Sequence, residues 1–448
     1  MEALCAFPWK FMRARRRSIT FMRLGIVLLL VSSGMAQKGQ EIGIAPAGDV
    51  QSHTSATPVG LKDLIREAEK NSPEITAAEL GYRAATHVAP QVSALPDTQV
   101  TVQQLSVGSP RPFAGYTNSD FSYIGVGASQ EIPYPGKRGL RALVANREAD
   151  VRHVQIESAR RTVADKLKAA YFRLAYLQQT LSVLERNDRL LKDVEQVVES
   201  RYRVGKGNQQ EVLKAQLQHT KILQEITMHH REVGQLEAHL KQFLNRPQDS
   251  PDIQTEPLIG RALTYSASEL FSLAREQNAD VQVQQAVVKK TESQVEVKKK
   301  EFRPDFSVQY MYQNTDRKFR DYYMASFSLV LPNRGRRKAE LAEAEANREQ
   351  ANKQLEVEIQ QRLAEIQDQY VVAQTSQEQL KIYKDGLIPQ SNATFQSGLA
   401  AYQANRQDFE TLLSSFMDVL NLQLEYQREL ADHEMALARL ETLTGVNF

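Results

Sequence analysis

The chain has 448 residues, of which 42% are hydrophobic and 25% are charged, and its formal net charge is +2. A mean hydropathy of −0.46 excludes a helical membrane protein with many spans, and the near-neutral charge argues against a nucleic acid as partner. With only 21 Gly and 16 Pro, the composition favours long helices over an all-β fold.

The N-terminus has the pattern of an export signal. Six Lys or Arg residues precede or touch an apolar run at 24–31, and small residues follow as far as Ala36. We expect a signal peptide at 1–36 and a flexible leader at 37–58, with translation starting at Met1 or Met22. Cleavage would remove Cys5, the only cysteine, so the mature chain would have neither disulfides nor cysteine metal ligands.

The remaining chain divides into two halves with the same predicted order of elements. The first half, 59–247, contains a helix, strands at 97–107 and 121–132, a long helix at 137–203, a turn at 204–208 and a helix at 209–245. After a linker at 248–265, the second half, 266–448, contains a helix, strands at 305–313 and 322–331, a long helix at 336–402, a turn at 403–407 and a helix at 408–444. Short motifs recur at an offset near 200 residues, which indicates an internal duplication.

The long helices have the spacing of coiled coils. Leu167, Leu174, Leu177, Leu181 and Leu184 follow one another at intervals of three, four or seven residues. At 1.5 Å per residue, the first long helix could extend roughly 100 Å.

The strand pairs alternate apolar and polar residues over segments of about ten residues, which is typical of tilted transmembrane strands. Val100 and Val102, for example, alternate with Gln and Thr. Four strands cannot close a barrel, and an open edge in lipid leaves backbone groups unpaired. Lipid insertion would therefore require strands from several chains; a soluble sheet packed on the helices is the alternative.

With these features, the sequence resembles the TolC-like outer-membrane efflux proteins from about Leu61 to the C-terminus. The resemblance rests on Pro133-Tyr134-Pro135-Gly136-Lys137-Arg138 after a strand, Arg201-Tyr202-x-x-Gly205 at a helix end, and Glu211-Val212-Leu213-Lys214-Ala215 beyond it. The first-half motifs are most similar to the heavy-metal cation efflux branch.

The resemblance implies a mainly α fold with a transmembrane β part. Three copies would each give four strands to one 12-stranded outer-membrane barrel, and the antiparallel coiled-coil helices would form a periplasmic tunnel. The implied partners are two further copies, a periplasmic adaptor, an inner-membrane pump reached through the adaptor, and outer-membrane lipid. The implied function is a passive exit channel for metal cations or drugs, not an enzyme. The resemblance does not specify the class of pump, or whether the entrance is closed at rest.

The two predicted turns are the expected periplasmic tips and adaptor contacts. Gly205, Gly207 and Asn208 tolerate the positive φ that a tight reversal requires, and Asn405 stands where the family usually has Gly. The contact residues are Val204, Gly205, Lys206, Gly207, Asn208, Gln403, Ala404, Asn405, Arg406 and Gln407. Ordinary surface turns without a partner are the alternative.

The periplasmic entrance is expected just after the second turn, at Asp408, Glu410, Thr411 and Ser414. Family members often carry two Asp three residues apart here, but the corresponding positions are Thr411 and Ser414. Asp408, and after it Glu410, is the candidate for an acidic ring that would attract cations. Asp408 is an equally good candidate for a helix N-cap.

No sequence motif of a hydrolase, a metalloprotease or a nucleotide-binding loop is present, so no catalytic, cofactor or metal residues are assigned. His219, His229, His230 and His239 lie on one predicted helix, where a solvated polar face is favoured over a metal site. The competing hypothesis for the whole chain is a periplasmic coiled-coil adaptor or scaffold without a channel.

Overall fold

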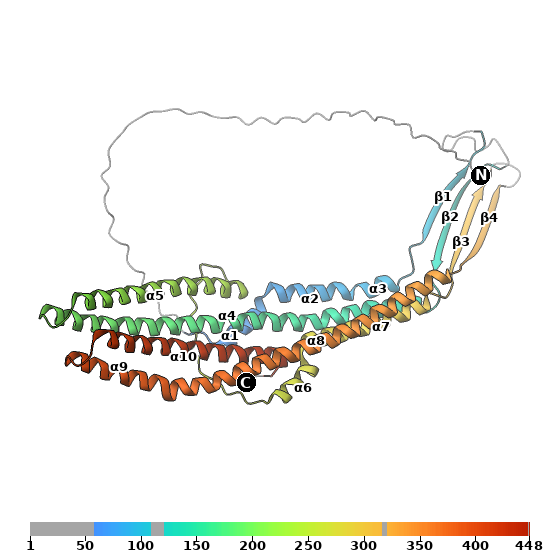
Figure 1. The fold of residues 1–448 in the computed structure, drawn as a ribbon. Coiled ribbons are helices and arrows are strands. Elements are labelled where there is room, and N and C mark those ends of the chain that lie inside the picture. The colour runs from blue at the N-terminus through green and yellow to red at the C-terminus, as the bar shows by residue number, and fades with distance from the viewer. Residues whose placement is uncertain (1–57, 109–120, 316–319, 447) are drawn as a thin grey trace, which may run out of the picture. The chain divides into compact units, whose positions relative to one another are not determined.

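The computed structural model of the chain describes residues 58–108, 121–315, 320–446 and 448 (Figure 1). The expected signal peptide at 1–36 lies outside the described residues, and so does the leader at 37–58 except for its last residue. The described chain is mostly helical, with one four-stranded antiparallel sheet. None of the helices in these ranges is both long and apolar enough to cross a membrane.

The sheet contains β1 (Gln99–Leu105), β2 (Tyr123–Ile132), β3 (Asp305–Asn314) and β4 (Asp321–Val330), in that spatial order. The two strand pairs are far apart in the sequence and join through β2 and β3, where Val126 lies opposite Tyr312. β1 and β4 are therefore the two edges of the sheet, and each pairs with one neighbouring strand.

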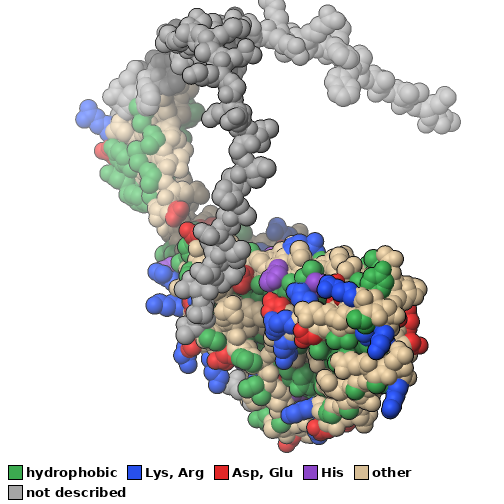
Figure 2. All heavy atoms as spheres, turned by 90° about the vertical axis from the view of Figure 1, so that its left-hand side faces the viewer, with side chains coloured by type: hydrophobic (Ala, Val, Ile, Leu, Met, Phe, Trp, Pro, Cys, Tyr) green, Lys and Arg blue, Asp and Glu red, His purple; other side chains and the backbone are tan. Residues whose placement is uncertain are grey.

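The two faces of the sheet differ in polarity. One face carries the cross-strand row Val102, Val126, Tyr312 and Tyr323, and the other carries the row Gln99, Ser129, Gln309 and Ser326. Val102 and Tyr323 are 65% and 66% exposed. Figure 2 shows hydrophobic side chains gathered along one side of the sheet. Among the residues that the structure describes, this alternation leaves an apolar face uncovered.

The long helices form a row. The 67-residue α4 (Lys137–Arg203) packs against α5 (Gln209–Phe243) on one side and α10 (Phe409–Thr444) on the other. The side chains of Leu167, Leu174 and Leu184 are fully buried, as expected for a coiled-coil seam. The second half contributes α8 (Arg334–Ile382) and α9 (Ile388–Gln403), which pack on α10.

The second long helix differs from the unbroken segment expected at 336–402. A π-helical turn at Tyr383–Leu387 separates α8 from α9. Pro389, the second residue of α9, follows this turn, and a proline has no N–H to donate and clashes with the carbonyl four residues earlier. The wider turn accommodates this proline within a continuous helical path.

The shorter helices cover the sheet-proximal and central parts of α4 and α8. α1 (Leu61–Asn71), α2 (Pro73–Thr86) and α3 (Val88–Ser93) pack on α4, α6 (Ala267–Gln277) on α8, and α7 (Ala279–Lys300) on both. The hydroxyl of Tyr171 anchors the linker at 248–265, because it accepts a hydrogen bond from the Glu256 N–H at 3.0 Å and donates to the Val59 carbonyl at 3.2 Å.

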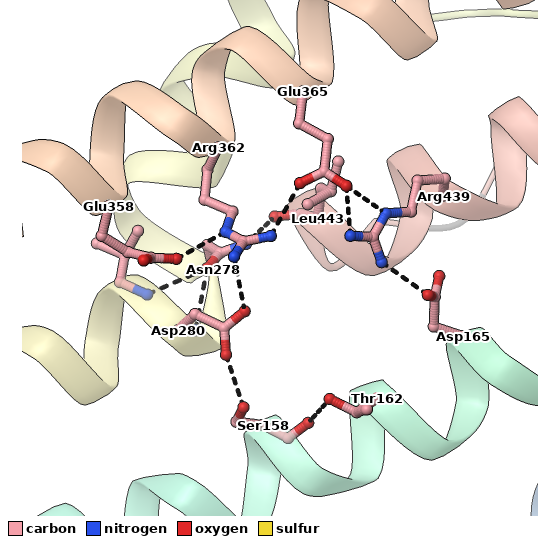
Figure 3. A network of polar contacts seen from close by, with 11 residues as sticks. Ser158, Thr162, Asp165, Asn278, Asp280, Glu358, Arg362, Glu365, Arg439 and Leu443 are labelled. Carbon is pink, nitrogen blue, oxygen red and sulfur yellow. Dashed lines mark hydrogen bonds and ion pairs between the residues drawn. The ribbon is translucent and has the colours of Figure 1, made fainter.

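Part-buried ion pairs join helices of the two halves (Figure 3). Arg439 of α10 donates to Glu365 of α8 at 2.6 Å and to Asp165 of α4 at 2.7 Å. Arg362 also donates to Glu365, at 2.8 Å. The Ser158 hydroxyl adds a 2.6 Å bond from α4 to Asp280 of α7. These contacts fix α4, α7, α8 and α10 against one another.

Candidate functional site: the paired helical turns

Both predicted turns end their helices with the same backbone geometry. Gly205 has a φ of +74° and Asn405 a φ of +59°. In each turn the residue after this position donates its N–H to a carbonyl five residues back: Lys206 to Arg201, and Arg406 to Ala401, both at 2.9 Å. This is the Schellman arrangement, in which a left-handed residue satisfies carbonyls at a helix end. Gly and Asn are the residues that adopt this conformation at low cost.

Two residues of the first turn differ from the sequence expectation of positive φ. Gly207 has no positive φ; a Cβ there would lie 3.0 Å from the backbone N of Tyr202, so this glycine permits a close approach of the chain. Asn208 has a φ of −108° and caps α5, because its side-chain oxygen accepts the Gln210 N–H at 3.0 Å.

The acidic candidates after the second turn each have a local partner. Asp408 caps α10 and accepts the Thr411 N–H at 2.8 Å. Hydrogen bonds from Thr411 lower the pKa of the Asp408 carboxyl. Glu410 forms an ion pair with Lys214 of α5. The structure therefore assigns Asp408 the role of a helix cap and pairs Glu410 with a cation.

The other two entrance candidates, Thr411 and Ser414, are exposed on α10. Asp418 and Glu425, one and two heptads beyond Thr411, are exposed at the same helical phase. Neither acid was among the expected entrance residues, which all lie within the first turns after the second reversal. The signal that could have found them is the polar stripe at intervals of three and four: Thr411, Ser414, Asp418, Asn421, Glu425.

Arg201 joins the two turns, and the sequence analysis did not predict this contact. From the end of α4 its guanidinium donates to the carbonyl of Tyr402, and at 2.7 Å to the side-chain oxygen of Asn405. The same group also lies 4.3 Å from the centre of the Tyr402 ring. A cation over an aromatic face adds electrostatic attraction to the hydrogen bonds.

Tyr402 extends this contact to α5. Its side chain is buried, and its hydroxyl donates to Glu211 at 2.7 Å. Burial, together with the bond to Glu211, raises the pKa of Tyr402, so the hydroxyl remains a donor. Figure 2 views the helix end that carries both turns, where positive and negative side chains intermingle. The turns thus form one linked surface within the chain.

The histidines of α5 do not gather into a metal centre. His219 lies between Asp188 and Glu195 of α4. Its Nε2 is 3.0 Å from Oδ1 of Asp188, and its Nδ1 is 3.4 Å from Oε2 of Glu195. Among the described residues, no group of three or more His, Cys, Asp or Glu has the geometry to hold a metal ion.

The sequence model of a family described as "Outer membrane efflux protein" matches residues 64–246 and 270–445. This chain belongs to that family. The family consists of passive outer-membrane channels rather than enzymes, and its members work as homotrimers with periplasmic adaptors and inner-membrane pumps. Membership implies an outer-membrane location and confirms the TolC-like resemblance.

Solved structures of such channels share the fold. The outer membrane protein VceC of Vibrio cholerae has a TM-score of 0.72 at 19% identity, over 87% of this chain and 96% of that one. The CmeC channel of Campylobacter jejuni has 0.72 at 14%, over 86% and 85%. The open state of the MtrE channel of Neisseria gonorrhoeae has 0.66 at 16%, over 84% and 88%. No curated protein matches the sequence.

Proposed function

We propose that this chain is the outer-membrane exit channel of a tripartite efflux system. Three copies form one 12-stranded barrel in the outer membrane and a periplasmic tunnel of long helices. The barrel and tunnel passively conduct metal cations or drugs that arrive from an inner-membrane pump through a periplasmic adaptor. Export depends on the signal peptide at 1–36, and the two halves of the chain derive from a duplication.

The observation that carries this proposal is the sheet. Its apolar row is exposed and its opposite row is polar, which is the alternation expected when one face meets lipid and the other lines a lumen. Its two edge strands would leave backbone groups unpaired in lipid unless β4 of one copy pairs with β1 of the next. A closed ring of copies satisfies both requirements.

The paired turns are the proposed adaptor contact. Both lie at one end of the helices, linked by Arg201, and they expose Lys206 and Arg406. Exposed turns carried by rigid helices are well suited to protein contact. Charge reversal at both positions should impair export while leaving the oligomer intact.

The entrance is the proposed site of cation preference. With Asp408 used as a cap and Glu410 paired, the exposed Asp418 and Glu425 supply negative charge along α10. Three copies of such a stripe around one axis would raise the local cation concentration. This argument favours cationic cargo; the heavy-metal branch stays a prediction.

The test is membrane fractionation combined with native mass measurement of the detergent-extracted protein. The proposal expects an outer-membrane protein with the mass of three mature chains, and a deletion strain with raised sensitivity to metals or drugs. A monomer in the periplasmic fraction would overturn it. The double variant Val102→Lys with Val126→Lys tests the lipid face. It should fail to insert into the outer membrane, because charge at mid-membrane is costly. The control is Gln103→Lys with Gln309→Lys, on the polar face.

A further inference from the structure

Aromatic side chains mark the end of the sheet that lies next to the helices (Figure 1). Near the start of β3, on the apolar face, the ring centre of Phe306 is 5.7 Å from that of Phe327 and 6.3 Å from that of Tyr134. Tyr312 and Tyr323 form a second aromatic pair further along the same face. Six residues separate Phe306 from Tyr312, which is about 20 Å of strand. An apolar band between two aromatic girdles is typical of a barrel surface in lipid, so Phe306 and Tyr134 mark one membrane boundary.

Positive charge is concentrated immediately beyond this boundary. The segments that enter and leave the sheet here, 94–98, 131–141, 298–305 and 331–341, contain eleven Lys or Arg residues and five Asp or Glu residues. Their net charge is therefore +6, whereas that of the whole chain is +2. A cluster of this kind creates a positive potential that attracts anions.

The acids of these segments pair with some of the cations and leave others free. Glu301 and Asp305 contact the buried Lys137 at 3.5 and 2.9 Å. Glu340 contacts Arg337 at 2.7 Å. These pairs fix the start of α4 and of α8 against the segment that leads into β3.

Three cations near the strand ends form no ion pair among the residues that the structure describes: Lys300, Arg303 and Arg334. Lys300 is the last residue of α7, and its ammonium group lies 5.4 Å from the centre of the Tyr134 ring, next to the apolar face. Arg303 and Arg334 are exposed, two residues before β3 and four residues after β4. All three therefore lie close to the membrane boundary that the aromatic rings mark.

Helix stability does not account for this charge. A helix N-terminus has a partial positive charge and favours acids in its first turn. Such an acid is present in α1, α2, α5, α6, α7 and α10. The two helices that begin at the sheet, α4 and α8, have none there, and four of the first five residues of α8 are Arg or Lys. These cations repel one another and oppose the helix dipole, so an external anion would stabilise them.

We infer that Lys300, Arg303 and Arg334 bind the phosphate groups of anionic phospholipids in the membrane leaflet that faces the periplasm. This inference rests on the proposed outer-membrane channel and names the class of lipid that it binds and the residues that bind it. Anionic headgroups attract Lys and Arg placed at a membrane surface. The neighbouring aromatic rings favour a phospholipid over free phosphate, because its acyl chains can pack beside them.

Lipid titration of the full-length trimer, followed by native mass measurement, tests the inference. The detergent-extracted protein is stripped of lipid, and phosphatidylglycerol or phosphatidylethanolamine is added in separate series. The unsubstituted protein should bind the anionic phosphatidylglycerol more tightly. The triple variant Lys300→Gln, Arg303→Gln, Arg334→Gln should lose this preference. Its affinity for phosphatidylglycerol should fall roughly 10- to 100-fold, because each cation near an anionic surface contributes about a factor of five.

Two controls separate the loss of charge at this surface from the loss of charge in general. The first removes three exposed cations from α5 and from the end of α8 far from the sheet: Lys221→Gln, Arg231→Gln, Lys381→Gln. The second keeps the charge at the proposed surface: Lys300→Arg, Arg303→Lys, Arg334→Lys. Both should retain the preference for phosphatidylglycerol. If the triple Gln variant does not assemble, Arg334→Gln alone should weaken binding about fivefold.

The outcomes separate this inference from the proposed channel. A trimer that binds the two lipids equally well, or whose preference survives the triple Gln substitution, overturns the inference and keeps the channel. Inorganic phosphate replaces the lipid in a third series; binding as tight as that of phosphatidylglycerol would assign the surface to a free anion and also overturn the inference. A monomer for the unsubstituted protein overturns both.

Discussion

Arg201 of α4 donates a 2.7 Å hydrogen bond to the side-chain oxygen of Asn405, so two turns about two hundred residues apart in sequence are held by one guanidinium. The same group donates at 3.2 Å to the carbonyl of Lys206 in its own turn. Asn405 therefore has two roles: it adopts the left-handed conformation and it accepts this bond. A glycine could do only the first.

Arg201→Ala should loosen both turns. It removes charge-assisted bonds to the second turn, each worth about 1.5–3 kcal/mol, so amide hydrogen exchange at 401–407 should accelerate. The control is Arg203→Ala, whose side chain is 77% exposed and pairs with Glu199 on its own helix at 3.3 Å; that pair is worth about 1 kcal/mol or less. Equal exchange rates in the two variants would contradict the linking role.

Substitutions at Asn405 should separate its two roles. Asn405→Asp keeps an acceptor and tolerates positive φ, so protection of the turn should match or exceed that of the native chain. Asn405→Gly keeps the conformation but loses the bond. Asn405→Ala loses both and adds strain of about 1 kcal/mol. Exchange protection of the turn should decrease in the order Asp, Asn, Gly, Ala. An Ala variant that is better protected than the Gly variant would refute the argument from φ.

Asp408→Asn should be nearly silent in stability and in conductance, because Asn caps a helix about as well as Asp. Asp408→Ala should fray the start of α10. Since hydrogen bonding lowers the pKa of Asp408, its stabilising contribution is present above the ordinary carboxyl pKa and disappears as pH falls through the lowered value.

Asp418→Asn provides the contrast on the same helix. If the exposed acids of α10 line the entrance, this variant should lower cation selectivity in single-channel recordings while the fold persists. If Asp408→Asn changed the cation selectivity and Asp418→Asn did not, Asp408 rather than Asp418 would line the entrance, contrary to our assignment.

Glu237 should make stability depend on pH near neutrality. Burial, and then the nearby Asp252, raise the pKa of Glu237 from 4.5 to about 7. The folded protein thus holds a proton that the unfolded chain releases, so stability should fall as pH rises from about 4.5 to 7. Glu237→Gln should flatten this dependence and stabilise the protein above pH 7, measured by denaturation at pH 5 and pH 8. Glu225→Gln, exposed on the same helix, is the control and should not change the slope.

Periodicity in the sequence predicts the elements well where a single seam dominates. The leucines of α4 and the alternating residues of β1 to β4 are local patterns, because burial repeats every 3.5 or every two residues. The left-handed residues Gly205 and Asn405 were also predictable from local sequence, because only a few residue types adopt that conformation readily.

The contacts that link distant segments could not be predicted in this way. Arg201 carries no local sign that its partner is Asn405, and Lys214 none that it pairs with Glu410, because such pairs depend on how the helices are placed side by side. Asp408 is compatible with two roles in the sequence, and its bond to the N–H of Thr411 shows that it caps α10. The break at 383–387 had a sign in Pro389, but prolines occur in kinked helices as well as at helix ends.

The π-helical turn changes the phase of the helix that follows it. Five turns of α-helix take about 18 residues. The buried Ser376 of α8 and the buried Phe395 of α9 are one residue further apart in sequence than five such turns. The wider turn absorbs this additional residue. Phe395 and Tyr402 therefore still face α10, although each lies one position later in the sequence than a regular α-helix would place it. Deleting one residue from 383–387 would turn α9 by about 100° about its own axis. The length of this short segment therefore matters more to the packing of α9 than its composition does.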